Sequence, residues 1–324
     1  MKNKIKARAT LITFISICFI VLLGFDLLAQ TISPPQIASE RQIEVEDPAG
    51  TGKKAIEVLK RQKYEQMAPP SPGDDAIGQQ YILKRKTEYM PFSVFADISL
   101  NWTSNVALTK NSPQDDNFFL YTTGASYQPI LSRNLLGEIT ATYQWFRYDR
   151  FNEMDFDSFN IGGGLSYAIP EVENLVFFGR YNYNRLTNSD ATGEYYSNNS
   201  ITFGIFKTFP LARTHYIYGG LTSQFGFATP KLYQRDYHTF LCGYNILITE
   251  KVSLDLNARF SYIPYQEDGR NDYNEAVTLN ISYKPRPWLN IYFIGFAAFN
   301  QSNRSVFEYN VVNLAPNIGI KIRF

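Results

Sequence analysis

The feature that most constrains this chain is an alternation of apolar and polar residues, with a period of two, that begins near Pro91 and recurs to the C-terminus. Side chains alternate across a β-strand, so such a segment has one apolar and one polar face. Each segment is longer than the roughly 9–11 residues with which a tilted strand crosses a bilayer. We predict twelve strands, over residues 91–103, 117–130, 135–148, 157–169, 174–186, 197–209, 213–227, 235–249, 251–264, 273–285, 288–300 and 309–324.

The connections between these segments alternate strictly between long polar ones, such as 103–117 and 266–274, and tight ones, such as 170–174 and 248–251. Long loops on one side and short turns on the other are typical of transmembrane barrels. A soluble sandwich has no reason to keep that order. The sequence therefore predicts an all-β fold, a closed antiparallel transmembrane β-barrel of twelve strands over residues 91–324.

The strand count also predicts how the barrel closes. Lipid cannot satisfy the backbone groups of an open strand edge, so the last strand must pair with the first. An even number of strands returns the chain to the side where it started. We therefore expect both termini on the side of the short turns, which is the periplasmic side of such barrels.

Composition excludes several other classes of protein. Charged residues make up only 19% of the chain and aromatic residues 16%, and no long apolar run follows the N-terminal region, which excludes a bundle of transmembrane helices. A formal net charge of +1 gives no argument for nucleic-acid binding. Only two cysteines and two histidines are present, so we expect neither a metal site nor a cofactor.

The N-terminal part differs from the rest of the chain. Residues 1–29 combine a basic start, an apolar stretch at 11–23 and a possible cleavage site near Ala29, which predicts a secretory signal peptide. Residues 30–90 carry many proline and glycine turn signals, with one short basic helix expected at 53–67. Two interpretations stay open: a mobile periplasmic arm, or a docking helix for a periplasmic partner, peptidoglycan or the barrel mouth.

The C-terminal strand places Ile320, Ile322 and Phe324 on one face and Lys321 and Arg323 on the other. This pattern resembles the terminal assembly signal of bacterial outer-membrane β-barrel proteins, including porins. The resemblance covers residues 91–324 and implies a Gram-negative outer membrane, recognition by the barrel-assembly machinery and contact with lipopolysaccharide. It implies an architecture rather than an activity.

Polar residues of the alternating segments are expected to face the lumen. Two interpretations are open for them: a polar interior that fills a narrow barrel, or a wet conduit whose mixed charges set solute preference. Their roughly balanced signs argue against strong selectivity for anions or cations. The charged lumen candidates are Asp97, Glu138, Arg180, Asp255, Arg259, Lys284, Lys321 and Arg323.

Aromatic residues at strand ends are predicted to form girdles at the two membrane surfaces, although carbohydrate stacking at the mouth is an alternative. Two of them fall near the outer surface, and the others, with Phe324, near the inner one. These girdle candidates are Trp102, Trp145, Tyr127, Tyr167 and Trp288.

Three functions remain compatible with the sequence. The first is a passive channel for small polar solutes, and the second is a structural or adhesion barrel without an open pore, tethered by its N-terminal arm. The third is a lipid hydrolase, for which the sequence gives less support. An assisted serine needs a nearby base, and neither His215 nor His238 has a serine two residues further on. We therefore expect no enzyme activity.

Overall fold

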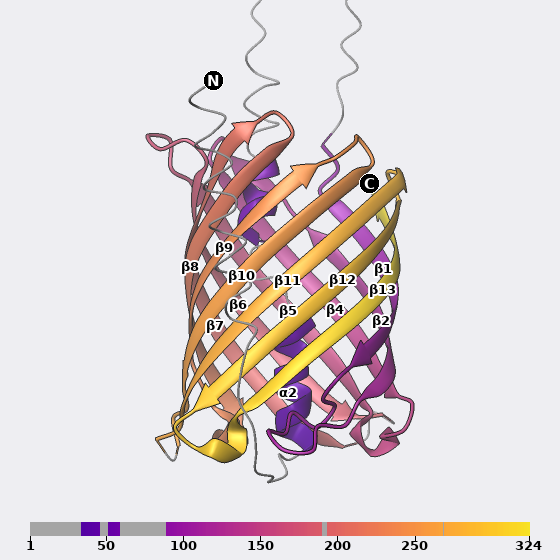
Figure 1. Cartoon of the computed structure of the whole chain (residues 1–324). Coiled ribbons are helices and arrows are strands. Elements are labelled where there is room, and N and C mark those ends of the chain that lie inside the picture. The colour runs from indigo at the N-terminus through magenta and orange to yellow at the C-terminus, as the bar shows by residue number, and fades with distance from the viewer. Residues whose placement is uncertain (1–33, 46–50, 59–88, 190–192, 268) are drawn as a thin grey trace, which may run out of the picture.

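The computed structural model describes residues 34–45, 51–58, 89–189, 193–267 and 269–324. Twelve long antiparallel strands form a closed barrel around one lumen (Figure 1). The barrel strands are β1 (Phe92–Thr103), β2 (Asp116–Tyr127), β4 (Leu135–Tyr148), β5 (Phe156–Ala168), β6 (Leu175–Asn188), β7 (Glu194–Ala212), β8 (His215–Thr229), β9 (Tyr237–Leu247), β10 (Val252–Pro264), β11 (Asn271–Arg286), β12 (Leu289–Ser302) and β13 (Tyr309–Arg323).

The barrel closes where the first strand meets the last. β1 pairs with β13, for example Ile98 with Ile318. On its other side β1 pairs with β2, which in turn pairs with β4. The seam ends in two backbone hydrogen bonds between Phe92 and Phe324, at 3.1 and 3.0 Å, and their rings stack. No barrel strand is left with an open edge, as lipid requires.

The twelve predicted strands are confirmed, each to within three residues at either end, and β4 coincides with the predicted 135–148. One detail differs. The second predicted strand was extended to residue 130, but β2 ends at Tyr127 and a short additional strand, β3 (Ile130–Ser132), pairs with the start of β4. Pro129, which has no backbone N–H for a ladder, lies at this break.

The alternation of the sequence appears as alternating exposure. Along β13, exposed residues such as Ile318 and Ile320 alternate with buried ones such as Asn317. The exposed apolar side chains point outward, and the polar ones point into the lumen. The core of this protein is therefore the inside of the barrel.

The two ends of the barrel differ, and we name them by their connections. The loop end carries the long connections, including 104–115, and the turn end carries the short ones and Phe324 (Figure 1). Within the described residues, no helix is long and apolar enough to cross a membrane.

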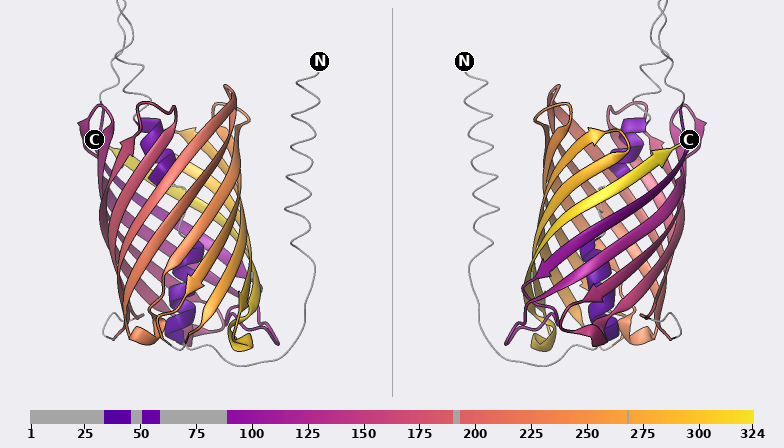
Figure 2. Two further views of the ribbon diagram at one scale, coloured as in Figure 1. Left: turned by 90° about the vertical axis from the view of Figure 1, so that its left-hand side faces the viewer. Right: turned by 90° about the vertical axis from the view of Figure 1, so that its right-hand side faces the viewer.

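The described parts of the N-terminal region, for which a periplasmic arm and a docking helix were both expected, lie within the barrel. Two helices, α2 (Pro34–Val45) and residues 51–58, lie inside the barrel, α2 at the loop end and the shorter helix near the turn end (Figure 2). We call them together the lumen segment. The predicted helix at 53–67 is helical at 53–58, and its remainder lies outside the described residues. The signal peptide predicted at 1–29 also lies outside them.

The unpredicted α2 begins at a proline pair that resembles a linker signal in the sequence. Proline is well suited to the first turn of a helix, where its missing N–H would have no acceptor. Both helices carry polar side chains, which find partners on the polar lumen wall instead of solvent. This is the physical reason why they lie inside the barrel.

Candidate functional site

The lumen, with the segment inside it, is the candidate functional site. The lumen segment contacts the wall at both ends of the barrel. Ile37 of α2 packs with Leu108 and Tyr309 at the loop end, and Ala55 packs with Phe206 and Tyr218 nearer the turn end. The two described helices therefore lie along the lumen, α2 at the loop end and the 51–58 helix nearer the turn end.

Arg41 holds α2 to the wall where β1 and β13 meet. Arg41 is only 1% exposed. Its guanidinium donates hydrogen bonds to Thr103 Oγ1 (3.0 Å), Asn313 Oδ1 (3.3 Å) and the Asn105 carbonyl (2.5 Å). A buried charge without such partners would cost several kcal/mol. The planar fork of arginine suits a site with several acceptors.

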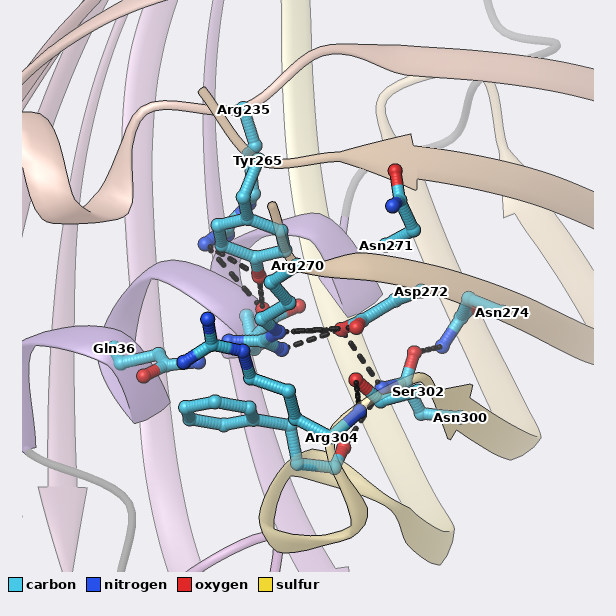
Figure 3. Close-up of polar contacts among 12 residues, drawn as sticks. Gln36, Arg235, Tyr265, Arg270, Asn271, Asp272, Asn274, Asn300, Ser302 and Arg304 are labelled. Carbon is cyan, nitrogen blue, oxygen red and sulfur yellow. Dashed lines mark hydrogen bonds and ion pairs between the residues drawn. The ribbon is translucent and has the colours of Figure 1, made fainter. Parts of the chain in front are cut away.

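Glu40 binds the opposite side of the loop end. Its carboxylate lies 3.3 Å from the Arg235 guanidinium, with both side chains buried, and accepts a hydrogen bond of 3.0 Å from Tyr265 (Figure 3). Burial raises the pKa of the Tyr265 hydroxyl, so it stays protonated and remains a donor. Arg235 also donates to Ser39 Oγ at 3.2 Å. These contacts fix one turn of α2.

A second buried ion pair supports this contact. Arg270 pairs with Asp272, and its guanidinium lies between the rings of Tyr265 (3.9 Å) and Phe307 (3.6 Å) (Figure 3). Asn300 donates to Asp272 at 3.1 Å. Cation–π stacking on two faces and a carboxylate on the edge hold Arg270 in one position. Tyr265 is thus packed from both sides.

The 51–58 helix is held by fewer polar contacts. Lys53 Nζ lies 3.1 Å from the Asp255 carboxylate and donates to Tyr218 Oη at 2.9 Å. The side chains of Lys53 and Asp255 are 20% and 14% exposed to solvent. Thr51 accepts a 3.4 Å hydrogen bond from Arg180, and a Cβ on Gly52 would overlap the Phe206 side chain.

Among the described residues, two sizeable cavities lie beside the lumen segment. The first chamber has a volume of about 520 Å³, and its lining runs from Phe118 and Asn313 near the loop end to Ser253 and Lys284 near the turn end. The second chamber has a volume of about 410 Å³ and is lined largely by threonine, asparagine and basic side chains. Arg259 lines both.

The structure brings most of the predicted lumen charges to these chambers. Those lining the first are Asp97, Asp255, Arg259 and Lys284, and those lining the second are Arg180, Arg259 and Lys321. Glu138 forms an ion pair of 3.1 Å with Arg180. Arg323 lies on the lumen-facing register at the end of β13 but is exposed and lines neither chamber.

The predicted girdle residues lie on outward registers or in turns at the barrel ends. Tyr167 and Trp288 are exposed, whereas Trp102, Trp145 and Tyr127 are half-buried. Tyr127 stacks on Phe92, with ring centroids 4.3 Å apart. Among the assembly-signal residues, Ile320, Ile322 and Phe324 are all exposed on the outer face.

One contact on the outer wall was not foreseen. His238 Nδ1 lies 3.2 Å from Ser223 Oγ, on the neighbouring strand and on the lipid-facing register. A groove of about 480 Å³ passes this pair and is lined by Leu221, Phe240 and Phe260. Spacing along one strand could not find it, because cross-strand pairing brings the two residues together. Within the described residues, no group of three or more histidine, cysteine or acidic side chains could hold a metal ion.

The sequence interpretation missed the functional side chains of the lumen segment and of the long loops. Glu40, Arg41 and Lys53 belong to a region interpreted as an arm or a docking helix. Arg270 lies in a long polar connection, and Arg235 is the first residue of the predicted strand 235–249. A proline pair followed by residues without further proline or glycine up to 45 was the one available signal for α2.

Comparison with models of known protein families finds no match, and no curated protein matches the sequence. Solved structures of similar fold were found. An outer-membrane channel from Pseudomonas putida F1 is 9% identical, covering 75% of this chain and 100% of that chain, with a TM-score of 0.49. The translocator domain of the autotransporter NalP from Neisseria meningitidis is 12% identical, covering 74% and 90%, with a TM-score of 0.43.

The KdgM porin is 6% identical, covering 70% of this chain and 98% of that chain, with a TM-score of 0.41. At these identities the likeness concerns the fold. The closed antiparallel barrel itself is established by the strand pairing of this structure.

Proposed function

We propose that this protein is an outer-membrane channel for small polar solutes whose lumen is narrowed by its own N-terminal segment. The observation that carries the proposal is the first chamber, whose polar lining extends from one half of the barrel to the other beside the lumen segment. Its asparagine, serine and threonine side chains suit hydrated solutes. The lumen segment adds polar groups to the same passage through Arg41 and Lys53.

Conductance in planar bilayers tests the proposal. The full chain is expected to give small, steady steps, and a variant lacking residues 34–58 is expected to give steps several times larger, because the two helices occupy part of the conducting cross-section. Correctly folded barrels that are silent in both forms would overturn the proposal. If the deletion variant fails to fold, liposomes that contain the full chain are tested for swelling in sugars of increasing size. Swelling with small sugars supports the channel, and no swelling overturns it.

A barrel without an open pore, tethered to a periplasmic partner, is the second candidate. The buried contacts of Arg41 and Glu40 favour it, since they hold α2 across the loop end. A full chain that is silent in bilayers and impermeable in liposomes, while the deletion variant conducts, would support it.

The Ser223–His238 contact favours a third candidate, a lipid hydrolase on the outer wall. Ser223 Oγ would attack an ester carbonyl while His238 takes its proton, and the alcohol would leave with that proton before water releases the fatty acid. Fatty-acid release from phosphatidylcholine vesicles, lost in Ser223→Ala and kept in His215→Ala, is the expected result. Wild-type protein that releases none would contradict this candidate.

The position in the membrane belongs to the same proposal. We place the turn end and Phe324 in the periplasm and the long loops outside, following the usual asymmetry of such barrels. The exposed Ile320, Ile322 and Phe324 support recognition by the barrel-assembly machinery, and the exposed aromatic residues support contact with lipid and lipopolysaccharide. Replacing Phe324 by Ala is expected to lower the amount of folded barrel in the outer membrane. Unchanged amounts would contradict it.

A further inference from the structure

The lumen segment changes the charge of the lumen. Of the residues that line the two chambers, three are acidic and seven are basic. Three of the seven basic residues, Arg41, Lys53 and Lys54, come from the lumen segment, as does one of the three acidic residues, Glu40. The lumen segment therefore adds a surplus of two basic groups to the chambers, and the wall residues that line them have a surplus of two as well.

The acidic groups are largely neutralised. Asp255 pairs with Lys53, and Glu40 pairs with Arg235. Asp97 accepts a 3.0 Å hydrogen bond from Tyr292. Glu138, which lies beside the second chamber, pairs with Arg180. Two of the three carboxylates that line the chambers, Asp255 and Glu40, thus contribute little negative potential to a passing solute. Asp97 is hydrogen-bonded to a neutral hydroxyl and, among the described residues, has no ion pair within 4.0 Å.

The basic groups of the second chamber are less fully neutralised. In the described parts of the chain, Lys54 and Lys321 form no ion pair within 4.0 Å, although Asp97 and Glu138 lie within electrostatic range of Lys321. Lys54 and Arg323 repel the Lys321 ammonium group. Lys54 belongs to the lumen segment and Lys321 to β13, so one charge lines the chamber from the helix and the other from the barrel wall.

Besides its basic groups, the second chamber carries hydrogen-bond donors suited to oxygen anions, alongside apolar side chains such as Phe178 and Phe296. It also carries the Glu40 carboxylate, which is paired with Arg235. Its threonine hydroxyls include Thr142, Thr202 and Thr222, and Asn160 supplies an amide. Lysine with hydroxyl and amide donors is a common combination at sites for carboxylate or phosphate oxygens. The volume of about 410 Å³ is of the size that binds small molecules.

We propose that the second chamber binds small anions with carboxylate or phosphate oxygens between Lys54 and Lys321, so that the channel passes anions in preference to cations. The preference in transport rests on the proposed channel function, whereas the binding does not. The lumen segment is then part of the selectivity site, because it supplies one of the two lysines.

Reversal potentials across a KCl gradient test the preference in transport. Wild-type protein is expected to favour chloride over potassium. Lys54→Gln and Lys321→Gln are each expected to lower that ratio by about threefold, from one unit charge at a few ångströms in a watery pore. The matched control is Lys207→Gln, which removes the same charge from the lipid-facing side of β7, where Lys207 lies over the Phe209 ring.

An unchanged ratio in Lys207→Gln completes the expected result. A wild-type channel that favours potassium, or an equal shift in the Lys207 and Lys321 variants, would overturn the proposal. High salt should weaken the preference, because the charges lie in a hydrated lumen.

Calorimetric titration in a nonionic detergent tests binding without conduction. Inorganic phosphate and acetate are used as separate probes, and either is expected to bind saturably to wild-type protein and several times more weakly to the Lys54→Gln/Lys321→Gln double variant. Binding by a barrel that does not conduct would refute the channel function and keep the anion site. Absence of saturable binding by both probes would overturn the site.

Discussion

α2 and the 51–58 helix occupy the same lumen, but they meet its wall through different chemistry. The described side chains of α2 from Gln36 to Gln42 are all buried, and two of them are charged groups with several partners each. The 51–58 helix buries Ala55 and Ile56, while Lys54 and Glu57 are exposed. Its Lys53–Asp255 pair keeps contact with water.

This difference indicates that the loop half of the lumen segment is fixed and that the turn half opens more easily. A partly hydrated ion pair contributes about 1 kcal/mol or less, whereas each hydrogen bond to a buried charge contributes roughly 1.5–3 kcal/mol. Local opening follows the weakest set of contacts. The four predictions below test the comparison, and all use thiol labelling in a Cys242→Ser background.

The largest effect is expected between two reporter cysteines. Ala38 of α2 and Ala55 of the other helix are both small and almost fully buried, at 3% and 1% exposure. Cysteine at 55 is expected to react with a soluble maleimide about a hundredfold faster than cysteine at 38, since its opening costs about 3 kcal/mol less. Equal rates would show that the lumen segment opens as one unit.

Glu40→Gln is expected to weaken the loop half. It leaves Arg235 buried without its carboxylate, at a cost of about 2 kcal/mol, so labelling at Ala38→Cys should rise about thirtyfold. Glu57→Gln makes the same chemical change at an exposed position and serves as the control. A rise of similar size with the control would mean that net charge, and not the buried pair, holds α2.

Gly52→Val is expected to displace the turn half. A side chain at this position overlaps Phe206, and such overpacking costs roughly 1–1.5 kcal/mol, which raises labelling at Ala55→Cys about tenfold. Labelling at Ala38→Cys should stay unchanged. Phe206→Ala in the same chain should restore slow labelling, and failure of that rescue would point to strain in the helix backbone instead.

Lys53→Gln is expected to have the smallest effect. It removes a half-hydrated ion pair and the contact with the Tyr218 ring at 4.1 Å. Labelling at Ala55→Cys should rise less than about fivefold. A rise as large as that from Glu40→Gln at the loop end would remove the distinction between the two halves.

The strands of the barrel could be predicted from sequence because each carries its own signal. Alternation and turn residues act over a few neighbouring positions, so β4 was predicted to the residue and the seam followed from strand count. The lumen-facing residues followed from the same alternation, and Asp97, Arg180 and Asp255 do line the chambers.

The filling of the lumen could not be predicted in this way. Asp255 pairs with Lys53, and Arg235 with Glu40, residues about two hundred positions apart in the chain. No local pattern distinguishes a polar helix that lies in water from one that lies inside a polar barrel. The contact between Ser223 and His238 could not be predicted either, because it depends on how strands β8 and β9 pair along their whole length.

The helices in the lumen also affect the end of the barrel at which the described chain begins. Twelve strands return the chain to the mouth at which β1 begins, whereas the described part of the chain already begins with α2 at the loop end. α2 consequently lies at the loop end and the C-terminus at the turn end. A tag joined directly ahead of Pro34 is expected at the end of the long loops, whereas a tag after Phe324 is expected at the end of the short turns.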